Sequence, residues 1–352
     1  MKIVVLAGGL SPEREVSLVT GTGVCRALRE RGHRAILVDL YLGLETVPAD
    51  LETLFDAPDG LCPSAAIRVT APDLEAVKAR RSDRGPSHIG PHVLELCALA
   101  DVVFLGLHGR EGEDGRIQAT LDLLGVPYTG SGYVGSAMAM DKAVAKRMMD
   151  SAGIPTPAWR MLAYTEEEID RLAAELPMPC VIKNTTGGSS LGVFLPEDRA
   201  ALRRALAQVG SFGGQVIWEQ RIEGRELTVA VLGDRALPPV ETFPAKKNFD
   251  YEAKYQAGAA REICPAELAE EEARAAGDLA LRVHRCLGLS VYSRTDMMLD
   301  REGRLWCLES NSLPGMTPTS FVPREARAVG IDYGELCEEI LRLSLDVKRR
   351  EN

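Results

Sequence analysis

The sequence lacks a long apolar run, a closely spaced pair of cysteines and an excess of basic residues. No stretch approaches the roughly 18 consecutive apolar residues of a membrane-spanning helix. The first apolar run, residues 3–7, is too short for the apolar core of a signal peptide. We therefore expect neither a membrane protein nor a secreted one.

No C-x-x-C pair occurs among the eight cysteines, which are scattered through apolar segments. A zinc ribbon or a thioredoxin-type redox site is therefore not indicated. Reduced cysteines in the core of a cytoplasmic protein are the simpler interpretation. The sequence also contains no Walker motif, no internal repeat and no low-complexity tract.

Acidic residues exceed basic ones, 51 against 41, which gives a net charge of −10. A nucleic-acid-binding protein normally has a basic face, so we expect no nucleic-acid partner, although a local basic pocket is compatible with an acidic chain. With 352 residues, 45% of them hydrophobic, the chain can form two or three domains with a large core.

Strand and helix signals alternate along the first third of the chain. Short apolar runs predict buried strands at residues 3–7, 35–38 and 101–105, with a helix from about Pro12 to Arg31. Such alternation predicts a parallel sheet wrapped by helices. Residues 45–96 mix proline, glycine and charge, and we expect short elements and an exposed loop there.

The remaining chain carries further strand and helix signals. A helix from Ser136 to Ala152 is predicted to close at Gly153, and residues 153–157 are the best linker candidate. Residues 240–262 lack periodicity, and a loop this long is usually a functional lid or is disordered. Strands are expected at 180–183, 191–194, 216–219 and 226–232, and helices at about 198–209, 265–287 and 333–347.

The segment from Tyr292 to Asn311 predicts a hairpin with its turn at Glu302-Gly303. Folding about that turn sets Asp296 opposite Glu309 and Arg294 opposite Asn311, with all four on one face. Facing carboxylates repel, and Mg²⁺ is the usual compensation because it prefers carboxylate and amide oxygens. A solvated polar face with Arg294 paired to Asp296 explains the hairpin equally well. The sharp loop after it, at residues 312–317, favours the metal because ligands bind at such strand ends.

One glycine-rich stretch, Gly187–Gly192, follows Lys183 and lies between two strand signals. Consecutive N–H groups there would form an anion-binding nest, although an ordinary hairpin turn also explains the glycines. The G-x-S-x-G match at residues 188–192 is followed by a strand signal, whereas a nucleophile elbow needs a helix. A serine hydrolase is therefore not indicated.

Two other glycine stretches have weaker signals. Gly130–Gly135 spells G-x-G-x-x-G, but no good buried strand precedes it, so we prefer a tight loop that caps a helix. A nicotinamide-dependent oxidoreductase remains a remote alternative. Gly8–Ser11 precedes Glu13. An acidic residue is favourable near the N-terminus of a helix, so helix capping alone can explain Glu13. Lys142 and Lys183 suit phosphate binding, although an isolated lysine is usually solvated surface.

Taken together, these segments resemble the D-alanine–D-alanine ligase family of the ATP-grasp superfamily, from about residue 3 to residue 343. Eight motifs in the family's order argue against chance similarity. They are Gly8–Ser17, His108–Gly115, Met140–Lys142, Lys183–Gly192, Glu219-Gln220 with Gly224–Glu226, Tyr251–Tyr255, Cys264–Ala266 and Glu309–Ser320.

The resemblance implies an α/β fold of three parts. Residues 1–137 would form an N-terminal substrate-binding domain with a parallel sheet. Residues 138–224 and 225–352 would form two α+β subdomains that clamp ATP, and the second would carry the metal site and the lid loop. The family also implies a homodimer in the cytoplasm.

The resemblance further implies a role for each matching residue. ATP would be held by Lys142, Lys183 and Ser190, by Glu219 at the adenine and by Glu226 at the ribose. Two Mg²⁺ ions, for which Mn²⁺ can substitute, would be held by Asp296, Glu309 and Asn311. The amino acids would meet Glu13, His108, Ser189, Lys254, Tyr255, Arg294, Gly315, Ser320 and Phe321.

In this set Glu13 would bind the ammonium of the first D-amino acid, beside His108, and would hydrogen-bond Ser189 and Tyr255 across three domains. Lys254 would approach the γ-phosphate. The guanidinium of Arg294 and the N–H of Gly315 would form the oxyanion hole. Ser320 would take the carboxylate of the second amino acid.

The implied reaction joins two D-alanines through D-alanyl phosphate, for peptidoglycan precursors. Phosphoryl transfer of this kind needs charge neutralisation rather than a protein nucleophile. The chain departs from the family at Asn311-Ser312 and Ser320-Phe321, where Asn-Thr and Ser-Leu are common, so Phe321 would reshape the second subsite. The Lys254-Tyr255 pair favours an amine acceptor, which leaves D-serine open and makes D-lactate the weaker alternative.

Overall fold

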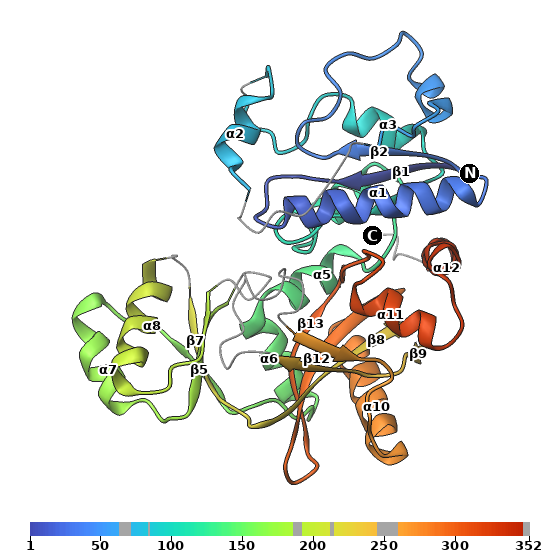
Figure 1. Ribbon diagram of the computed structural model, residues 1–352. Helices are drawn as coiled ribbons and strands as arrows, with labels where there is room; N and C mark the ends of the chain where they lie inside the picture. The colour runs from blue at the N-terminus through green and yellow to red at the C-terminus, as the bar shows by residue number, and fades with distance from the viewer. Residues whose placement is uncertain (63–71, 84, 186–191, 212–214, 245–259, 348–352) are drawn as a thin grey trace.

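The computed structural model describes residues 1–62, 72–83, 85–185, 192–211, 215–244 and 260–347. Within these residues the chain forms three sheets (Figure 1). The N-terminal sheet lies at the top of that view, the central sheet at the lower left and the largest sheet at the lower right.

The N-terminal sheet is parallel, with strand order β2-β1-β3, as the alternation of strand and helix signals predicts. Residues 3–6 are fully buried, which is expected for an apolar strand with neighbours on both sides. Its elements are β1 (Lys2–Ala7), α1 (Arg14–Glu30), β2 (Arg34–Asp39) and β3 (Val102–Leu105).

The sequence leaves residues 45–96 largely unassigned, and the described residues of this segment contain three short helices. They are η1 (Leu51–Asp56), α2 (Leu74–Ala79) and α3 (Val93–Leu99). Asp50 and Asp73 cap the first two by accepting backbone N–H bonds. After β3 the chain forms α4 (Arg116–Leu123).

The single helix predicted over residues 136–152 is wrong, because two helices occupy this region. They are α5 (Tyr133–Met140) and α6 (Lys142–Ser151). Asp141 between them has extended backbone, and its carboxylate accepts the N–H groups of Ala143 and Val144. An N-cap aspartate therefore starts a new helix where the apolar pattern alone runs on. The predicted stop at Gly153 holds, since its φ is +61°.

The central sheet is antiparallel, with strand order β4-β7-β5-β6. Helices α7 and α8 cover it, and their apolar side chains form one core with the strands. The elements are β4 (Trp159–Leu162), η2 (Glu166–Glu168), α7 (Ile169–Glu175), β5 (Cys180–Asn184), β6 (Val193–Phe194), α8 (Arg199–Ser211) and β7 (Val216–Gln220).

The largest sheet has strand order β11-β10-β8-β12-β13, with β9 paired to β8. Helix α10 covers the face that holds Val229, Met297 and Cys307. The elements are β8 (Gly224–Leu232), β9 (Arg235–Ala236), β10 (Val240–Pro244), β11 (Ala260–Ile263), α10 (Glu270–Cys286), β12 (Tyr292–Asp300), β13 (Leu305–Asn311), α11 (Phe321–Ala328) and α12 (Tyr333–Asp346).

Two predicted boundaries in this part are corrected. The loop expected at 240–262 begins and ends in the paired strands β10 and β11, and residues 245–259 lie outside the described part. The helix expected from Pro265 begins at Glu270, where the Glu272 carboxylate accepts the N–H of Ala269.

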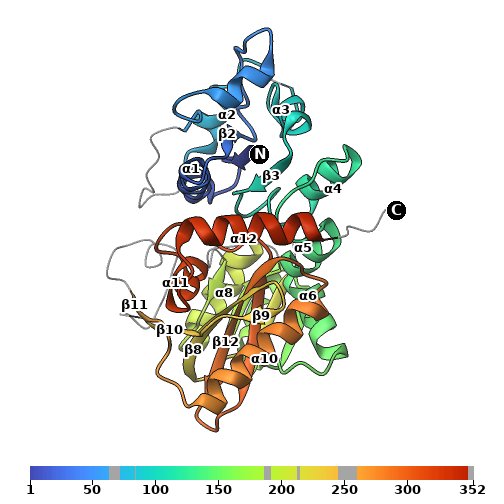
Figure 2. The same ribbon diagram turned by 90° about the vertical axis from the view of Figure 1, so that its right-hand side faces the viewer.

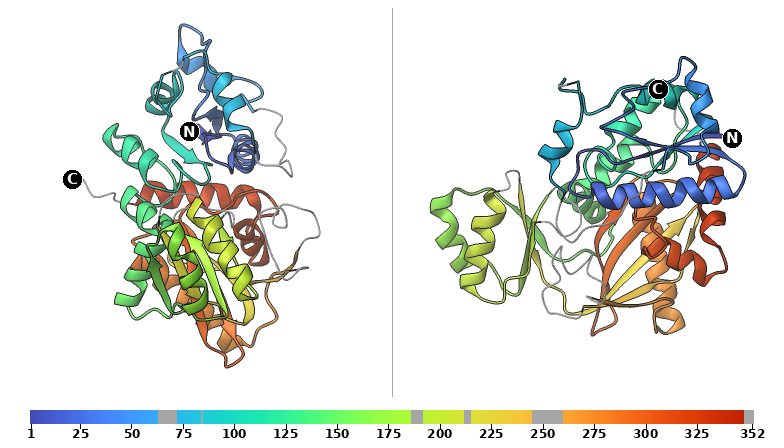
Figure 3. Two further views of the ribbon diagram at one scale, coloured as in Figure 1. Left: turned by 90° about the vertical axis from the view of Figure 1, so that its left-hand side faces the viewer. Right: turned by 45° about the horizontal axis from the view of Figure 1, so that its top comes forward.

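Helix α12 joins the C-terminal part of the chain to the N-terminal core. Its Leu336, Cys337, Ile340 and Leu341 are buried in the same apolar cluster as β1, β2 and β3. Figure 2 shows α12 lying across the boundary between the N-terminal sheet and the rest of the molecule, and the left view of Figure 3 agrees. Among the described residues, no helix is long and apolar enough to span a bilayer.

Candidate active site

The hairpin of β12 and β13 has the predicted register where the polar residues lie. Arg294 pairs with Asn311 and Asp296 pairs with Glu309, and all four side chains are half-buried. Below them a β-bulge shifts the register, so that Met297 faces Cys307. The bulge keeps Cys307 in the apolar core while Glu309 stays on the polar face.

Two cations of the chain neutralise the facing carboxylates. Arg294 donates to both oxygens of Asp296, from Nε at 3.0 Å and from Nη2 at 2.8 Å. Lys142 Nζ lies 3.2 Å from Glu309 Oε2. The Thr228 hydroxyl on β8 also donates to Asp296, at 2.9 Å. The pairing of Arg294 with Asp296 matches the alternative interpretation of the hairpin, but these two side chains are only 18% and 14% exposed, so the face is not a solvated one.

The loop after β13 is folded tightly beside this face. A Cβ on Gly315 would lie 2.8 Å from Ser320 Oγ, so this glycine permits a close approach. The hydroxyls of Thr317 and Ser320 are 2.7 Å apart. Phe321 follows at the start of α11, and its ring centroid lies 5.6 Å from the guanidinium carbon of Arg294. Four of the predicted residues, Gly315, Ser320, Phe321 and Arg294, are therefore brought to one place.

His108 connects this loop with the N-terminal sheet. Its Nδ1 lies 3.2 Å from the carbonyl oxygen of Leu313, and its Nε2 lies 3.0 Å from the hydroxyl of Thr20. A carbonyl only accepts, so Nδ1 carries the proton and Nε2 accepts from Thr20. Burial lowers the pKa of His108, which keeps the ring neutral.

Glu13 lies next to the His108 loop. A Cβ on Gly109 would be 2.7 Å from Glu13 Oε2, and Gly109 has a φ of +72°. The Ser11 hydroxyl donates to the His108 carbonyl at 2.7 Å and accepts the N–H of Glu13 at 3.1 Å. The two loops therefore hold Glu13 and His108 together, as the motifs predict.

Glu113 is a buried carboxyl at the same place, and sequence reasoning assigned it no role. Its Oε2 accepts the N–H of Gly109 at 2.7 Å. Burial and the negative charge of Glu13 raise the pKa of Glu113 to about 8, although the Gly109 hydrogen bond opposes the rise. The motif at residues 108–115 contains this residue, but only the fold reveals its distance from solvent.

The raised pKa of Glu113 predicts a pH-dependent contribution to stability. A carboxyl whose pKa rises from 4.5 to about 8 on folding binds more protons when folded, so it contributes most below about pH 4.5 and loses that contribution as the pH rises to 8. Glu113→Gln cannot lose a proton. Relative to wild type, the variant should gain up to about 4 kcal/mol in unfolding free energy between about pH 5 and pH 8. Urea denaturation of both proteins at these pH values measures the difference, and parallel pH profiles would contradict the expectation.

Glu219 is held between two buried lysines. Lys183 Nζ lies 2.5 Å from one carboxylate oxygen, and Lys146 Nζ lies 2.5 Å from the other. Burial opposes the charge on Glu219, but the two lysines lower its pKa, so it is ionised. Lys146 also donates to Thr156 at 2.6 Å. Sequence reasoning missed Lys146, because a lysine in a helix usually lies on the surface.

The other predicted residues fall into two groups. Glu226 lies on β8 opposite Met298, two residues before Thr228, so it shares the face of the sheet that carries Asp296. Ser189, Ser190, Lys254 and Tyr255 lie outside the described residues.

The G-x-G-x-x-G stretch has a packing role. A Cβ on Gly135 would lie 2.5 Å from the carbonyl oxygen of Gly288, and one on Gly130 would lie 3.0 Å from Leu313. Ser131 Oγ accepts the N–H of Ser290 at 3.0 Å. The contacts of Gly135 and Ser131 join this segment to the residues before β12, and the contact of Gly130 joins it to the loop after β13. Close packing therefore explains Gly130 and Gly135 without a dinucleotide.

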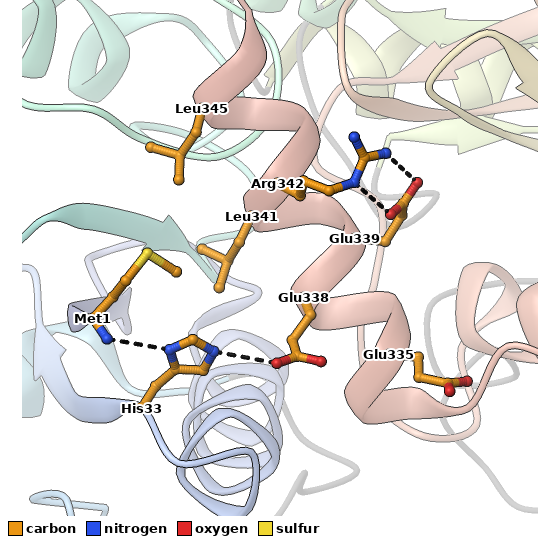
Figure 4. A pocket seen from close by; sticks show the side chains of 8 residues that line it. All are labelled: Met1, His33, Glu335, Glu338, Glu339, Leu341, Arg342 and Leu345. Carbon is orange, nitrogen blue, oxygen red and sulfur yellow. Dashed lines mark hydrogen bonds and ion pairs between the residues drawn. The ribbon is translucent and has the colours of Figure 1, made fainter.

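A surface hollow of about 450 Å³ lies elsewhere, between Met1, His33 and α12 (Figure 4). His33 lies there between the N-terminal amine and the carboxylate of Glu338, at 3.4 and 3.3 Å. None of the residues that line it belongs to the predicted site. The polar face of the hairpin remains the candidate active site.

Two family models together match most of this chain. The family model "D-ala D-ala ligase C-terminus" matches residues 148–342, and "D-ala D-ala ligase N-terminus" matches residues 2–131. The D-alanine–D-alanine ligase of Gloeobacter violaceus is 39% identical, over 98% of this chain and 100% of that protein. That of Desulfovibrio desulfuricans is 38% identical, over 100% of both.

Two solved structures extend the comparison. The ligase from Bacillus anthracis complexed with ATP has a TM-score of 0.72 at 30% identity, covering 98% of this chain and 97% of that one. The VanG D-Ala:D-Ser ligase from Enterococcus faecalis has a TM-score of 0.74 at 26% identity, covering 97% and 99%. The predicted family and α/β fold are confirmed, and the nicotinamide alternative is excluded. This chain belongs to the D-alanine–D-alanine ligase family.

Proposed function

We propose that this protein joins two D-alanines into D-alanyl-D-alanine, with conversion of ATP to ADP and phosphate, to supply peptidoglycan precursors. The observation that carries the proposal is the half-buried hairpin face of Arg294, Asp296, Glu309 and Asn311. It gathers the charges that phosphoryl transfer requires, next to a loop that can bind an amino acid. The full-length similarity to D-alanine–D-alanine ligases supports the choice of substrate.

The hairpin face has a donor set that suits Mg²⁺. Asp296 and Glu309 face each other across the ladder, and Asn311 lies on the same face. The amide nitrogen of Asn311 is buried without a hydrogen-bond partner among the described residues. The carboxylate oxygens of Asp296 and Glu309 and the amide oxygen of Asn311 would hold two Mg²⁺ ions, with Mn²⁺ as a substitute. When bound, the ions would neutralise charge on the phosphates of ATP.

The lysines and carboxylates of the central sheet would hold ATP. Lys142 and Lys183 supply positive charge for its phosphates, and Ser190 would contact the nucleotide beside them. Burial opposes the charge on Lys183, but Glu219 and Glu309 raise its pKa, so the ammonium stays charged. Glu219 would meet the adenine and Glu226 the ribose.

The two amino acids would bind between the hairpin face and the N-terminal loops. Glu13 would pair with the ammonium of the first D-alanine, whose carboxylate receives the γ-phosphoryl group. The second D-alanine, its carboxylate at Ser320, releases a proton from its ammonium to water, and the free amine attacks the acyl carbon. The further proton on the attacking nitrogen leaves with the phosphate. Arg294 and the Gly315 N–H would stabilise the resulting oxyanion, and the C–O bond to phosphate then breaks.

Residues outside the described part complete the proposal. Ser189 and Tyr255 would hydrogen-bond with Glu13, and Lys254 would approach the γ-phosphate. A lid in the 240–262 segment would exclude water, because acyl phosphates hydrolyse. We also propose that the chain divides into three parts, at residues 1–137, 138–224 and 225–352. We further propose that the protein is a cytoplasmic homodimer, and analytical ultracentrifugation would measure its mass.

The acceptor is the open part of the substrate assignment. The similarity to a D-Ala:D-Ser ligase makes D-serine the second candidate. Phosphate release with ATP and Mg²⁺ is measured for D-alanine alone, and with D-serine or D-lactate added, and product masses are read by mass spectrometry. We expect D-alanyl-D-alanine from D-alanine alone. A product that forms only with a second acceptor would overturn the assignment.

Replacing Gly109 tests the placement of Glu13. Gly109→Ala puts a methyl group 2.7 Å from Glu13 Oε2 at a φ of +72°. The backbone strain alone should cost about 1–2 kcal/mol. Gly330→Ala is the matched control, because its φ is +83° but nothing lies within 4 Å of the new methyl. Urea denaturation should show similar losses in both, whereas only Gly109→Ala should raise the KM for D-alanine. An unchanged KM would mean that Glu13 does not bind this substrate.

A further inference from the structure

Glu325 on α11 is a fully buried carboxyl outside the motifs and outside the roles assigned above. Its Oε2 accepts the backbone N–H of Ala230 on β8 at 2.6 Å. Its Oε1 is buried without a hydrogen-bond partner among the described residues. A group of this kind is costly to bury, so its presence calls for a physical reason.

The N–H that Glu325 satisfies lies at a gap in the sheet. Beyond Thr228, strand β10 no longer pairs with β8, and β9 pairs only from Val231. Leu237, directly after β9, donates its N–H to the Ala230 carbonyl at 2.8 Å, but the Ala230 N–H donates to Glu325 rather than to a strand carbonyl. Glu325 therefore replaces a missing strand carbonyl and fastens α11 to β8.

The same helix carries the residues beside Arg294. Phe321 is one helical turn before Glu325, so the two side chains share a face of α11. The Phe321 ring lies over Arg294, and Arg294 is the ladder partner of Ala230. The hydrogen bond from Glu325 therefore attaches α11 to β8 at Ala230, and the ring of Phe321 contacts β12 at the neighbouring Arg294.

A second contact fixes the outer side of α11. Arg324 Nη1 lies 2.7 Å from Glu262 Oε2 on β11. This ion pair is partly exposed and contributes little by itself. The buried bond from Glu325 is therefore the main polar anchor of α11 on the sheet among the described residues.

We propose that Glu325 is a positioning residue for the second amino acid: by anchoring α11 to β8, it holds Ser320 and Phe321 in place beside Gly315 and Arg294. The inference rests on the proposed function, because it takes Ser320 and Phe321 as the wall of the second subsite. Burial raises the pKa of Glu325 well above its usual range. A neutral side chain that accepts the same bond should therefore serve as well.

The test compares Glu325→Leu with Glu325→Gln in the full-length protein. Leucine fills a similar volume but accepts no hydrogen bond, whereas the glutamine amide oxygen can accept the Ala230 N–H. We expect Glu325→Leu to raise the KM for D-alanine about tenfold while the KM for ATP changes less than twofold. In Glu325→Gln, the KM for D-alanine and the KM for ATP should both stay within about twofold of the wild-type values.

Other results would overturn the proposal. An equal rise in both KM values, an unchanged D-alanine KM in Glu325→Leu, or a glutamine variant no better than leucine would each contradict it. If Glu325→Leu does not fold, Glu325→Asp takes its place, because the shorter acid cannot reach Ala230 unless α11 moves, and its D-alanine KM should rise severalfold. A double-mutant cycle with Phe321→Leu should show non-additive effects on that KM.

The outcome is separable from that of the proposed function. If wild type releases no phosphate with D-alanine, the proposed function fails. If wild type is active and the variants do not follow this pattern, only the role of Glu325 fails.

Discussion

Glu309→Gln is expected to lower kcat at least about a thousandfold, because both Mg²⁺ ions would share this carboxylate and a metal ion contributes several kcal/mol to such a transition state. The amide oxygen can still accept from Lys142, whose Nζ lies 3.2 Å from Glu309 Oε2. The hairpin should therefore keep its fold. Phosphate release gives kcat, and calorimetric titration with Mn²⁺ in the presence of ADP should show weaker metal binding.

The matched control for Glu309→Gln is Glu302→Gln in the turn of the same hairpin. The Glu302 side chain is 66% exposed and, within the described part of the chain, forms an ion pair with Arg304 alone, so kcat and Mn²⁺ binding should stay near wild type. Retained activity in Glu309→Gln, with normal Mn²⁺ binding, would refute the metal-ligand assignment. Loss of activity with unchanged Mn²⁺ binding would move Glu309 to a different role.

Arg294→Lys is expected to lower kcat about a hundredfold, since loss of one oxyanion-hole donor costs about 3 kcal/mol. Lysine keeps the charge but loses the planar fork, which here donates from two nitrogens to Asp296 and lies under the Phe321 ring. Initial rates at saturating ATP and D-alanine measure the effect. The thermal midpoint should change little, because the buried charge is retained.

Arg304→Lys is the control for this substitution. Arg304 is on the same hairpin, pairs with Asp300 and lies over Trp306, but its side chain is 63% exposed. Its kcat should stay within about twofold of wild type. If Arg294→Lys behaves in the same way, a simple positive charge is sufficient and the oxyanion role of the guanidinium is wrong.

The sequence predicts the hairpin face well because its information is local. Period-two alternation and a glycine turn set Asp296 opposite Glu309 without reference to the rest of the chain. The bulge near Leu308 escaped prediction, since one extra residue leaves no compositional signal. It lies between the predicted pairs and the turn, where Leu299 pairs with Leu305 instead of the expected Trp306. The turn is therefore offset by one residue from the prediction, and the bulge compensates for that offset, so Asp296 still faces Glu309.

Long-range burial is what the sequence could not supply. Lys146 and Glu325 are charged residues in helices that look amphipathic, and Glu113 lies in a glycine-rich loop. Such residues usually face water. Each is buried because distant parts of the chain meet there: Glu219 on β7, Gly109 beside Glu13, and the gap near Ala230. Asp141 is different, since a capping aspartate is a local signal that was available and was outweighed by the apolar pattern.

The position of α12 has a consequence for how the protein is made. Leu336, Cys337, Ile340 and Leu341 complete the apolar core around β1, β2 and β3, more than 200 residues after the last of these strands. A nascent chain on the ribosome therefore cannot finish its first domain until nearly all of it has been synthesised. Until α12 is synthesised, one apolar face of the N-terminal sheet stays uncovered. We therefore expect chaperones to bind the N-terminal domain during translation.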